Sequence, residues 1–238
     1  MRDYAKEFES RVNWIRQTAD GAGAKGVIFG NSGGKDSALV GILCKAACES
    51  TLGVIMPCQS KSNYGTDKTH AELLAKKFNI ETLVVDLTSV KEEAAKATGV
   101  KNPDALANIN PRLRMLTLYA MGQERGFLVA GTGNLSEITM GYFTKYGDGG
   151  CDFNPIADLT ATEVREFLAH LNAPKEIIGK PASAGLWDGQ TDEAEMGISY
   201  AELDAYILTG KATAQIKEKV EKAKAKTEHK RKMPAVYK

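Results

Sequence analysis

Four short apolar runs, rich in valine and isoleucine, constrain the fold of this chain more than any other feature. They cover residues 25–29, 51–57, 81–87 and 126–132. Such runs are typical of strands buried on both faces of a parallel sheet. Stretches with helical patterning lie between and after them, at 36–49, 66–78, 89–98 and about 111–125. The alternation predicts an α/β fold with a doubly wound, mostly parallel sheet, which we expect to have five strands and helices on both faces.

Length and charge limit the possible functions. The 238 residues suit one enzyme-sized domain over 1–238, and 31 Lys and Arg against 30 Asp and Glu leave a formal charge of +1. Overall charge therefore does not favour a nucleic acid or membrane partner. A basic tail at about 211–238 holds ten Lys or Arg and three Glu, a composition that a solvated amphipathic helix also explains. With no apolar run near the roughly 18 residues of a membrane span, and no signal-peptide pattern, we expect a cytoplasmic protein.

The segment FGNSGGKDSAL, residues 29–39, follows the first run and leads into a helical stretch. At such a turn, several backbone N–H groups have no partner within the helix and can bind phosphate oxygens. Gly33 and Gly34 allow a close approach, while Ser32 and Ser37 add hydroxyl donors. Asp36 is a hard oxygen ligand of the kind that Mg²⁺ prefers. The segment therefore predicts a site for a nucleotide phosphate and a magnesium ion; a sulfate site or a structural turn is the alternative.

Two better-known phosphate motifs do not fit. Residues 21–26, GAGAKG, match G-x-G-x-x-G, but they precede a strand instead of following one, so a flexible connector explains them. The P-loop pattern also fails at both ends, where Phe29 replaces the first glycine and Asp36 the Ser or Thr.

The SGGxDS loop resembles the pyrophosphate loop of the N-type ATP pyrophosphatases, which cleave ATP between its α- and β-phosphates. Residues 128–159 resemble the signature region of the NAD synthetases, and similar blocks occur at 54–57, 110–115, 181–193 and 226–232. Because an amidase-like domain is absent, the resemblance is to the ammonia-dependent form. It implies an adenine nucleotide α-hydrolase-like, Rossmann-like fold and a homodimer. It also implies amidation of deamido-NAD by ammonia, with ATP as co-substrate, to give NAD, AMP and pyrophosphate through an acyl-adenylate.

The resemblance assigns roles to individual residues. The ATP-binding set is Gly30, Asn31, Ser32, Gly33, Gly34, Lys35, Asp36, Ser37, Thr132 and Ser183. The deamido-NAD set is Arg112, Lys145, Asp152, His229 and Lys230. Arg114 could take the place of Arg112, and a solvated basic tail would also explain His229 and Lys230. Asp36 and Glu137 are the expected Mg²⁺ ligands, although Glu137 could instead only place charge at a helix N-terminus.

We predict that Lys35, Asp36 and Asp148 are catalytic. Asp148 lies in YGDGG, where flanking glycines let the chain fold closely over a ligand, and its carboxylate could orient ammonia or accept a proton. An Asx turn that stabilises the loop is the alternative role. Glycine-rich loops at 144–155 and 183–193 could close over the substrates and exclude water from the adenylate.

One position departs from the family pattern. Ala161 stands where relatives carry a lysine that helps to bind ATP, so Lys180 or another cation compensates, or ATP binds more weakly. Two other functions remain open: a tRNA-thiolating enzyme with the same loop, and an ATP-sensing module without turnover. The first would require a catalytic cysteine pair, whereas Cys44, Cys48, Cys58 and Cys151 form no C-x-x-C pair.

Overall fold

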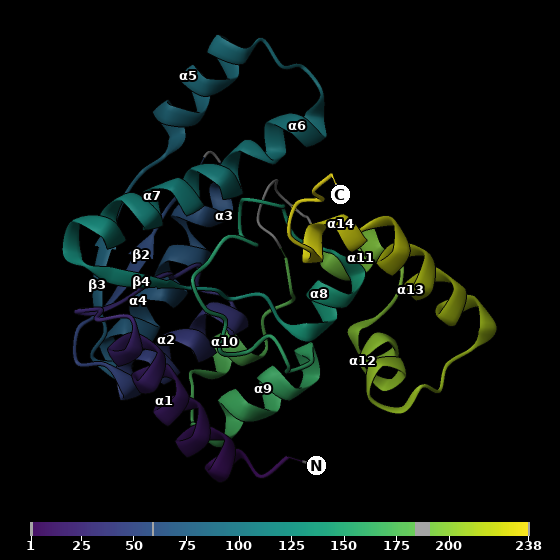
Figure 1. Cartoon of the computed structure of the whole chain (residues 1–238), viewed down its shortest axis with the longest axis horizontal. Coiled ribbons are helices and arrows are strands. Elements are labelled where there is room, and N and C mark those ends of the chain that lie inside the picture. Colours follow the sequence, from purple (N-terminus) through teal and green to yellow (C-terminus); the bar gives the residue numbers. More distant parts are fainter. Residues whose placement is uncertain (1, 59, 184–190, 238) are drawn as a thin grey trace.

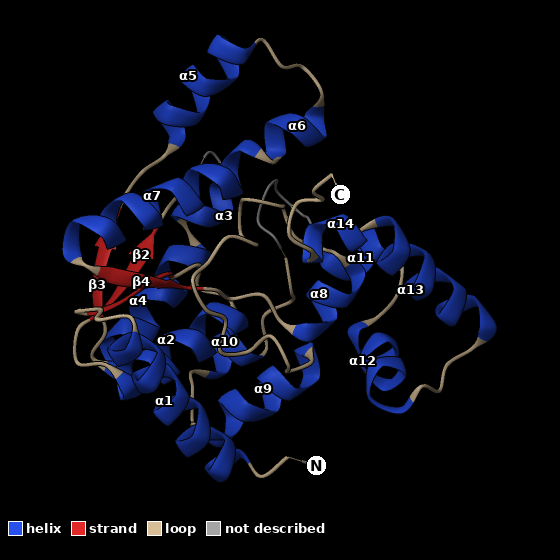
Figure 2. Cartoon of the chain, viewed as in Figure 1, coloured by secondary structure: helices blue, strands red, loops and turns tan. Residues whose placement is uncertain are grey.

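The computed structural model describes residues 2–58, 60–183 and 191–237. Four strands form one parallel sheet in the order β3-β2-β1-β4. Their bounds are Gly26–Gly30 for β1, Thr51–Ile55 for β2, Glu81–Val84 for β3 and Phe127–Ala130 for β4. Each predicted strand is confirmed (Figure 2), and the last residues of each longer run instead form the loops at the carboxyl edge of the sheet.

The prediction of a fifth strand is wrong for the described residues. Beyond β4, Phe153 pairs with Ala130 in a single parallel bridge. The Gly131 N–H donates to the Phe153 carbonyl at 2.8 Å, and the Asp152 N–H donates to the Val129 carbonyl at 2.9 Å. The ladder goes no further because Pro155, two residues later, has no N–H to donate.

Two groups of helices cover the sheet. On one face lie α1 (Tyr4–Gly21), α2 (Lys35–Ala47), α4 (Thr66–Phe78), α9 (Ala161–His170) and α10 (Lys175–Ile178). On the other lie α5 (Thr88–Thr98) and α7 (Ile109–Arg125), joined by the short α6 (Pro103–Ala107). A further short helix, α3 (Lys61–Tyr64), precedes α4. The predicted helical stretches are confirmed, with ends that differ by at most two residues from those of α2, α4, α5 and α7.

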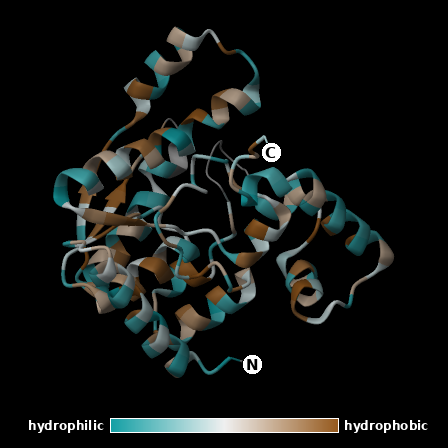
Figure 3. Cartoon of the chain, viewed as in Figure 1, coloured by the Kyte–Doolittle hydropathy of each residue, from teal (hydrophilic) through white to brown (hydrophobic). Residues whose placement is uncertain are grey.

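Strand periodicity divides the core between the two faces. Val27 and Phe29 of β1 pack with α2, whereas Ile28 between them packs with Leu118 of α7. All three β1 side chains are fully buried. Figure 3 shows hydrophobic residues gathered along the strands, as expected for a sheet covered on both sides.

A separate hydrophobic cluster lies beside the sheet and joins side chains of α8 (Leu135–Met140), α11 (Asp192–Met196), α12 (Tyr200–Thr209) and α13 (Ala214–Lys226). These helices and the short α14 (Glu228–Arg231) lie together in Figure 1. The basic tail forms α13 and α14, and α13 buries Val220 completely. Within the described ranges, no helix combines the length and hydropathy that crossing a bilayer requires. Of the predicted loop 183–193, residues 184–190 lie outside the described part.

Candidate active site

The predicted phosphate loop lies between the end of β1 and the start of α2. Gly33 has a φ of +70°, and a Cβ at this position would lie 2.1 Å from the Asp67 carbonyl oxygen, so the loop requires glycine there. Gly34 caps α2 without a side-chain hydrogen bond. The Ser32 and Ser37 hydroxyls lie 3.0 Å apart. The first amides of α2 therefore have no side-chain cap at the helix start and could bind an anion.

A buried polar cluster follows directly from this loop. Lys35 is 4% exposed, and its ammonium lies 2.5 Å from Asp36 Oδ2. The Asn134 side-chain amide donates to Asp36 Oδ1 at 2.9 Å. Asn134 also begins α8 in a capping box with Glu137, so one asparagine connects the two predicted metal ligands. Sequence reasoning missed Asn134, although an asparagine three residues before a glutamate is a recognisable helix-start signal.

Electrostatics in the cluster reflect its burial. Burial raises the pKa of Glu137 well above its ordinary value, and the nearby charge of Asp36 raises it further. Burial alone would lower the pKa of Lys35, but Asp36 and Glu137 together raise it above the ordinary value. The carboxylates therefore favour a cation between them, and Lys35 stays protonated.

Asp192, on α11, is a further acidic group that sequence reasoning missed. It is 3% exposed, and its Oδ2 accepts a hydrogen bond from the Tyr200 hydroxyl at 2.9 Å. Its Oδ1 is buried and has no hydrogen-bond partner among the residues that the structure describes. Burial raises its pKa, and its charge in turn acts on Glu137. No sequence signal links this residue to the phosphate loop, because the two are far apart along the chain.

The donor chemistry of the cluster fits a magnesium ion. Asp36 and Glu137 supply hard oxygens, and Mg²⁺ commonly takes one or two carboxylates with substrate phosphates and water as its other ligands. In the described part of the chain, no group of three His, Cys, Asp or Glu residues is arranged to hold a metal by itself. Phosphate oxygens would therefore complete the coordination.

A cavity of about 750 Å³ opens above the carboxyl edge of the sheet. Apart from Gly33, the residues predicted to bind ATP all line it. Glu137, Asp148 and Lys230 line it as well. The volume is within the range of pockets that enclose small molecules. The predicted ATP, metal and catalytic residues therefore share one cavity.

Four of the five residues predicted to bind deamido-NAD are not among those that line this cavity. Three of them form a chain of contacts: Arg112 donates to the Lys145 carbonyl at 3.4 Å, and Lys145 donates to the His229 carbonyl at 2.7 Å. Asp152 lies apart and accepts hydrogen bonds from Tyr119 and from the Val129 backbone. The neighbouring Arg114, unlike Arg112, lines the cavity.

Asp148 lies in the loop after α8 and faces the cavity. Its Oδ1 accepts a hydrogen bond from the Thr144 N–H at 2.9 Å, so the loop-stabilising bond considered in the sequence is present. The surrounding protein displaces bulk water and raises the pKa of Asp148, against the opposing effect of that hydrogen bond. Among the described residues, the hydrogen bond found for this carboxylate is at Oδ1, so Oδ2 can accept from a ligand.

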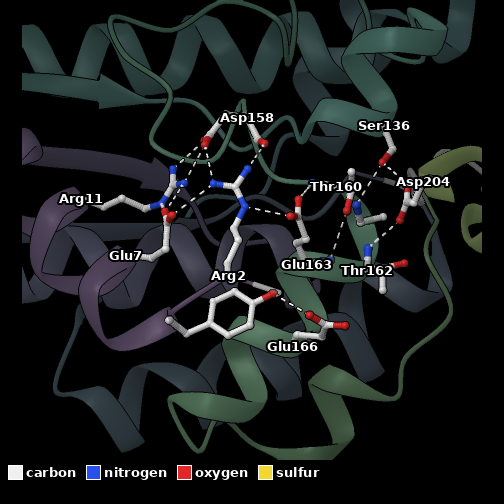
Figure 4. A network of polar contacts seen from close by, with 12 residues as sticks. Arg2, Glu7, Arg11, Ser136, Asp158, Thr160, Thr162, Glu163, Glu166 and Asp204 are labelled. Carbon is white, nitrogen blue, oxygen red and sulfur yellow. Dashed lines mark hydrogen bonds and ion pairs between the residues drawn. The ribbon is translucent and has the colours of Figure 1, made fainter. Parts of the chain in front are cut away.

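Ala161 and Lys180 have very different surroundings. Ala161 is fully buried, and its N–H donates to the Ser136 hydroxyl at 3.0 Å, in the network of Figure 4. Lys180 lies beside the phosphate loop, with its ammonium 3.4 Å from the Gly33 carbonyl oxygen and 2.5 Å from Asp67 Oδ1. A cation therefore lies next to the loop even though position 161 carries none.

Comparison with known proteins agrees with this geometry. A family model described as NAD synthase matches residues 7–234. The NH(3)-dependent NAD(+) synthetase of Carboxydothermus hydrogenoformans is 45% identical, over 98% of this chain and 98% of its own. The structure of NMN synthetase from Francisella tularensis matches with a TM-score of 0.95 and 33% identity, over 100% and 99% of the two chains. NH3-dependent NAD synthetase from Campylobacter jejuni matches with a TM-score of 0.82 and 30% identity, covering 100% of both. The chain therefore belongs to the NAD synthase family, as a C–N bond-forming ligase of the ammonia-dependent type.

Proposed function

We propose that this chain converts deamido-NAD, ATP and ammonia into NAD, AMP and pyrophosphate. The observation that carries the proposal is that the phosphate loop, the Asp36–Glu137 pair and Asp148 line one cavity. A carboxylate does not react usefully with ammonia because oxide would have to leave. Transfer of AMP to the carboxylate creates an acyl-phosphate bond that ammonia can break.

The residues of the chain have separable roles in this reaction. The loop amides and the hydroxyls of Ser32 and Ser37 hold the β- and γ-phosphates. Lys35, held against Asp36 at 2.5 Å, supplies a fixed positive charge near them. Preorganised donors of this kind contribute on the order of 2–4 kcal/mol each to the transition state. When bound by Asp36 and Glu137, Mg²⁺ would neutralise further phosphate charge.

Asp148 holds ammonia for the second step. Its free carboxylate oxygen can accept a hydrogen bond from ammonia and take a proton as the C–N bond forms. We therefore expect Asp148→Asn to retain exchange of labelled pyrophosphate into ATP but to lose NAD formation by roughly 100-fold, as for removal of a general base. Measuring both rates on one preparation checks this. Equal loss of the two activities would remove Asp148 from this role.

NAD formation is the direct test of the function. The protein is incubated with ATP, Mg²⁺, ammonium and deamido-NAD, and NAD is measured by absorbance after coupled enzymatic reduction. We expect NAD and pyrophosphate in equal amounts. ATP binding without pyrophosphate release would instead indicate a sensing module, and pyrophosphate release that requires tRNA would indicate a thiolating enzyme.

A mononucleotide substrate is the second candidate, favoured by the match to an NMN synthetase at a TM-score of 0.95. Arg112, Lys145 and His229 do not line the cavity, so it could accept a pyridine mononucleotide without them. The same assay with deamidated NMN decides between the two. A higher kcat/KM for the mononucleotide would replace deamido-NAD as the preferred substrate.

The working state of the enzyme is also part of the proposal. We infer a magnesium-dependent homodimer in the cytoplasm. All four cysteines are free thiols, which suits a reducing compartment.

A further inference from the structure

Arg114 is a partly buried cation in the cavity. In the described part of the chain, its guanidinium makes two hydrogen bonds, from Nε to the Met56 carbonyl at 3.2 Å and from Nη2 to the Asn63 amide oxygen at 3.0 Å. Both acceptors are neutral, and Nη1 takes part in neither bond. Burial lowers the pKa of Arg114, and the charges of Asp148 and Asp67 offset only part of this effect. A guanidinium in such surroundings is stabilised by an anion.

The other cations beside the phosphate loop already have acidic partners. Lys35 pairs with Asp36, and Lys180 pairs with Asp67, each at 2.5 Å. Among the described residues, no carboxylate forms an ion pair with Arg114. Among the described cations beside the phosphate loop, Arg114 is therefore the one prepared to receive an anionic group from a ligand; Lys230 also lines the cavity, but its ammonium donates to the Gly141 and Phe143 carbonyls at 2.8 and 2.7 Å.

A relay of polar contacts fixes Arg114 relative to the phosphate loop. Asn63, which accepts from Arg114, donates its amide to Asp67 Oδ2 at 2.9 Å. Asp67 binds the Lys180 ammonium, which lies 3.4 Å from the Gly33 carbonyl oxygen. The guanidinium is thereby held on the flank of the loop that receives the β- and γ-phosphates.

Asp148 lines the same cavity as Arg114 and the phosphate loop, and its charge acts on Arg114. The bound anion would therefore lie between the phosphate loop and the carboxylate that holds ammonia. On the proposed reaction path, the group that must lie between pyrophosphate and ammonia is the transferred adenylyl group. Its charged part is the α-phosphate.

We propose that Arg114 binds the α-phosphate of ATP and of the acyl-adenylate, an inference that rests on the proposed function. In the first step, a carboxylate oxygen of the substrate bonds to the α-phosphorus. The bond from that phosphorus to the bridging oxygen breaks, and pyrophosphate leaves with the electron pair. In the second step, ammonia bonds to the acyl carbon and AMP leaves with the electron pair of the acyl-oxygen bond. The paired N–H donors of the Arg114 guanidinium stabilise the negative charge on the α-phosphate in both steps.

Binding of AMP, adenosine and pyrophosphate, measured by isothermal titration in the presence of Mg²⁺, tests this assignment. The variants are Arg114→Gln and Arg114→Lys. The matched control is Arg125→Gln, because Arg125 lies on the same helix, pairs with Glu81 at 3.0 Å and does not line the cavity. We expect Arg114→Gln to weaken AMP binding roughly tenfold to 100-fold, as for loss of a charge-assisted hydrogen bond, and to leave adenosine and pyrophosphate binding within about threefold. Arg114→Lys should give an intermediate loss, because lysine keeps the positive charge but cannot make two parallel hydrogen bonds to the phosphate as a guanidinium can.

Unchanged AMP affinity in a folded Arg114→Gln protein would overturn the assignment, as would equal weakening of AMP and adenosine. If the glutamine variant does not fold, Arg114→Lys decides by the same comparison, and wild-type AMP affinity would overturn the assignment. The two proposals fail separately. A wild-type protein that makes no NAD but binds AMP through Arg114 would refute only the function, whereas an active enzyme with Arg114-independent AMP binding would refute only this inference.

Discussion

The acidic residues around Lys35 outnumber the cations that balance them. Asp36, Glu137 and Asp192 are three carboxyl groups near one ammonium, and their charges act on one another. When all are ionised, these three carboxylates and Lys35 together hold two negative charges in excess. The charge of Arg165 also acts on Lys35, and a divalent cation would offset the negative charge that remains. Replacing Glu137 therefore tests whether this cluster binds the metal ion.

We expect Glu137→Gln to leave the metal-free protein as stable as the wild type or slightly more stable. The substitution removes a buried charge next to Asp36, and glutamine can still accept the hydrogen bond from the Asn134 N–H. The stabilisation that Mg²⁺ and pyrophosphate together give should fall sharply, because binding to the folded state is weakened. Thermal unfolding with EDTA and with both ligands measures this. Glu202→Gln, in the equivalent capping box of α12, is the control for the cap. An unchanged ligand-induced shift would show that Glu137 does not hold the metal.

Restoring the family lysine at position 161 should not improve ATP binding. Ala161 is fully buried against Tyr200 and its neighbours, and the Lys35 ammonium lies 5.5 Å from the Tyr200 ring centre. We expect Ala161→Lys to lower the free energy of unfolding by roughly 2–4 kcal/mol, because it buries a second ammonium. Urea unfolding and the KM for ATP measure the two effects. A lower KM with unchanged stability would mean that a cation is missing.

At the scale of elements, a network of ion pairs ties α1 to the loop before α9 (Figure 4). Arg11 contacts Asp158 at 2.6 Å, and Arg2 contacts Asp158 at 3.2 Å and Glu163 at 2.8 Å. On the other side of Figure 4, Asp204 accepts from the Thr162 N–H at 2.8 Å and so joins α12 to the start of α9. The N-terminal and C-terminal parts of the chain thus meet at one helix end.

The contribution of Asp158 should depend on pH. Partial burial would raise its pKa, but the hydrogen bond and charge of Arg11 lower it below the ordinary value. The folded state therefore binds the proton less tightly than the unfolded state. The stabilisation is present above about pH 4 and is lost as the pH falls through the depressed pKa.

We expect Asp158→Asn to cost about 1 kcal/mol at pH 7, a modest value because the Asp158 side chain is 57% exposed. The difference from wild type should shrink below pH 4 when urea unfolding is followed across pH. Glu93→Gln, which removes an exposed pair with Lys96, should change stability by less than about 0.5 kcal/mol. A pH-independent difference at position 158 would contradict the ion-pair explanation.

At the scale of the molecule, one side of the sheet carries exposed apolar residues. Leu83 of β3, Val90 of α5 and Leu116 of α7 are 37%, 47% and 59% exposed, and α5 buries no residue. Exposed apolar surface of this kind commonly marks an interaction site. A second copy of the chain would cover it in the proposed homodimer.

Leu116→Asp tests that arrangement. We expect the wild type to sediment as a dimer at micromolar concentration and Leu116→Asp to shift toward monomer, because a charge at a buried interface is costly. Leu208→Asp is the control, since Leu208 is 55% exposed on α12, away from this side. A monomeric wild type, or equal dissociation of both variants, would contradict the proposed interface.

The sequence by itself determined the order of strands and helices and the place of the phosphate loop. These features are local: Val- and Ile-rich runs favour strands, and a strand followed by SGGKDS turns directly into a helix. The ends of α4 and the capping box at Thr160 also follow from neighbouring residues. The fifth strand could not be judged in this way, because its pairing with β4 depends on how far the 151–155 segment can follow that strand.

Only the tertiary structure decided which side chains meet. Arg112 and Arg114 are two positions apart on a helix, so they face different directions. Only the tertiary fold brings Arg114 to the Met56 carbonyl, just beyond β2, and into the cavity. Asn134 reaches Asp36 across 98 positions of sequence, and Asp192 approaches the same cluster from α11. Such contacts depend on the three-dimensional arrangement of α2, α8 and α11, which no local pattern encodes. The residue types in the sequence therefore predict which chemical groups the site contains, but only the fold determines which of these groups contact one another.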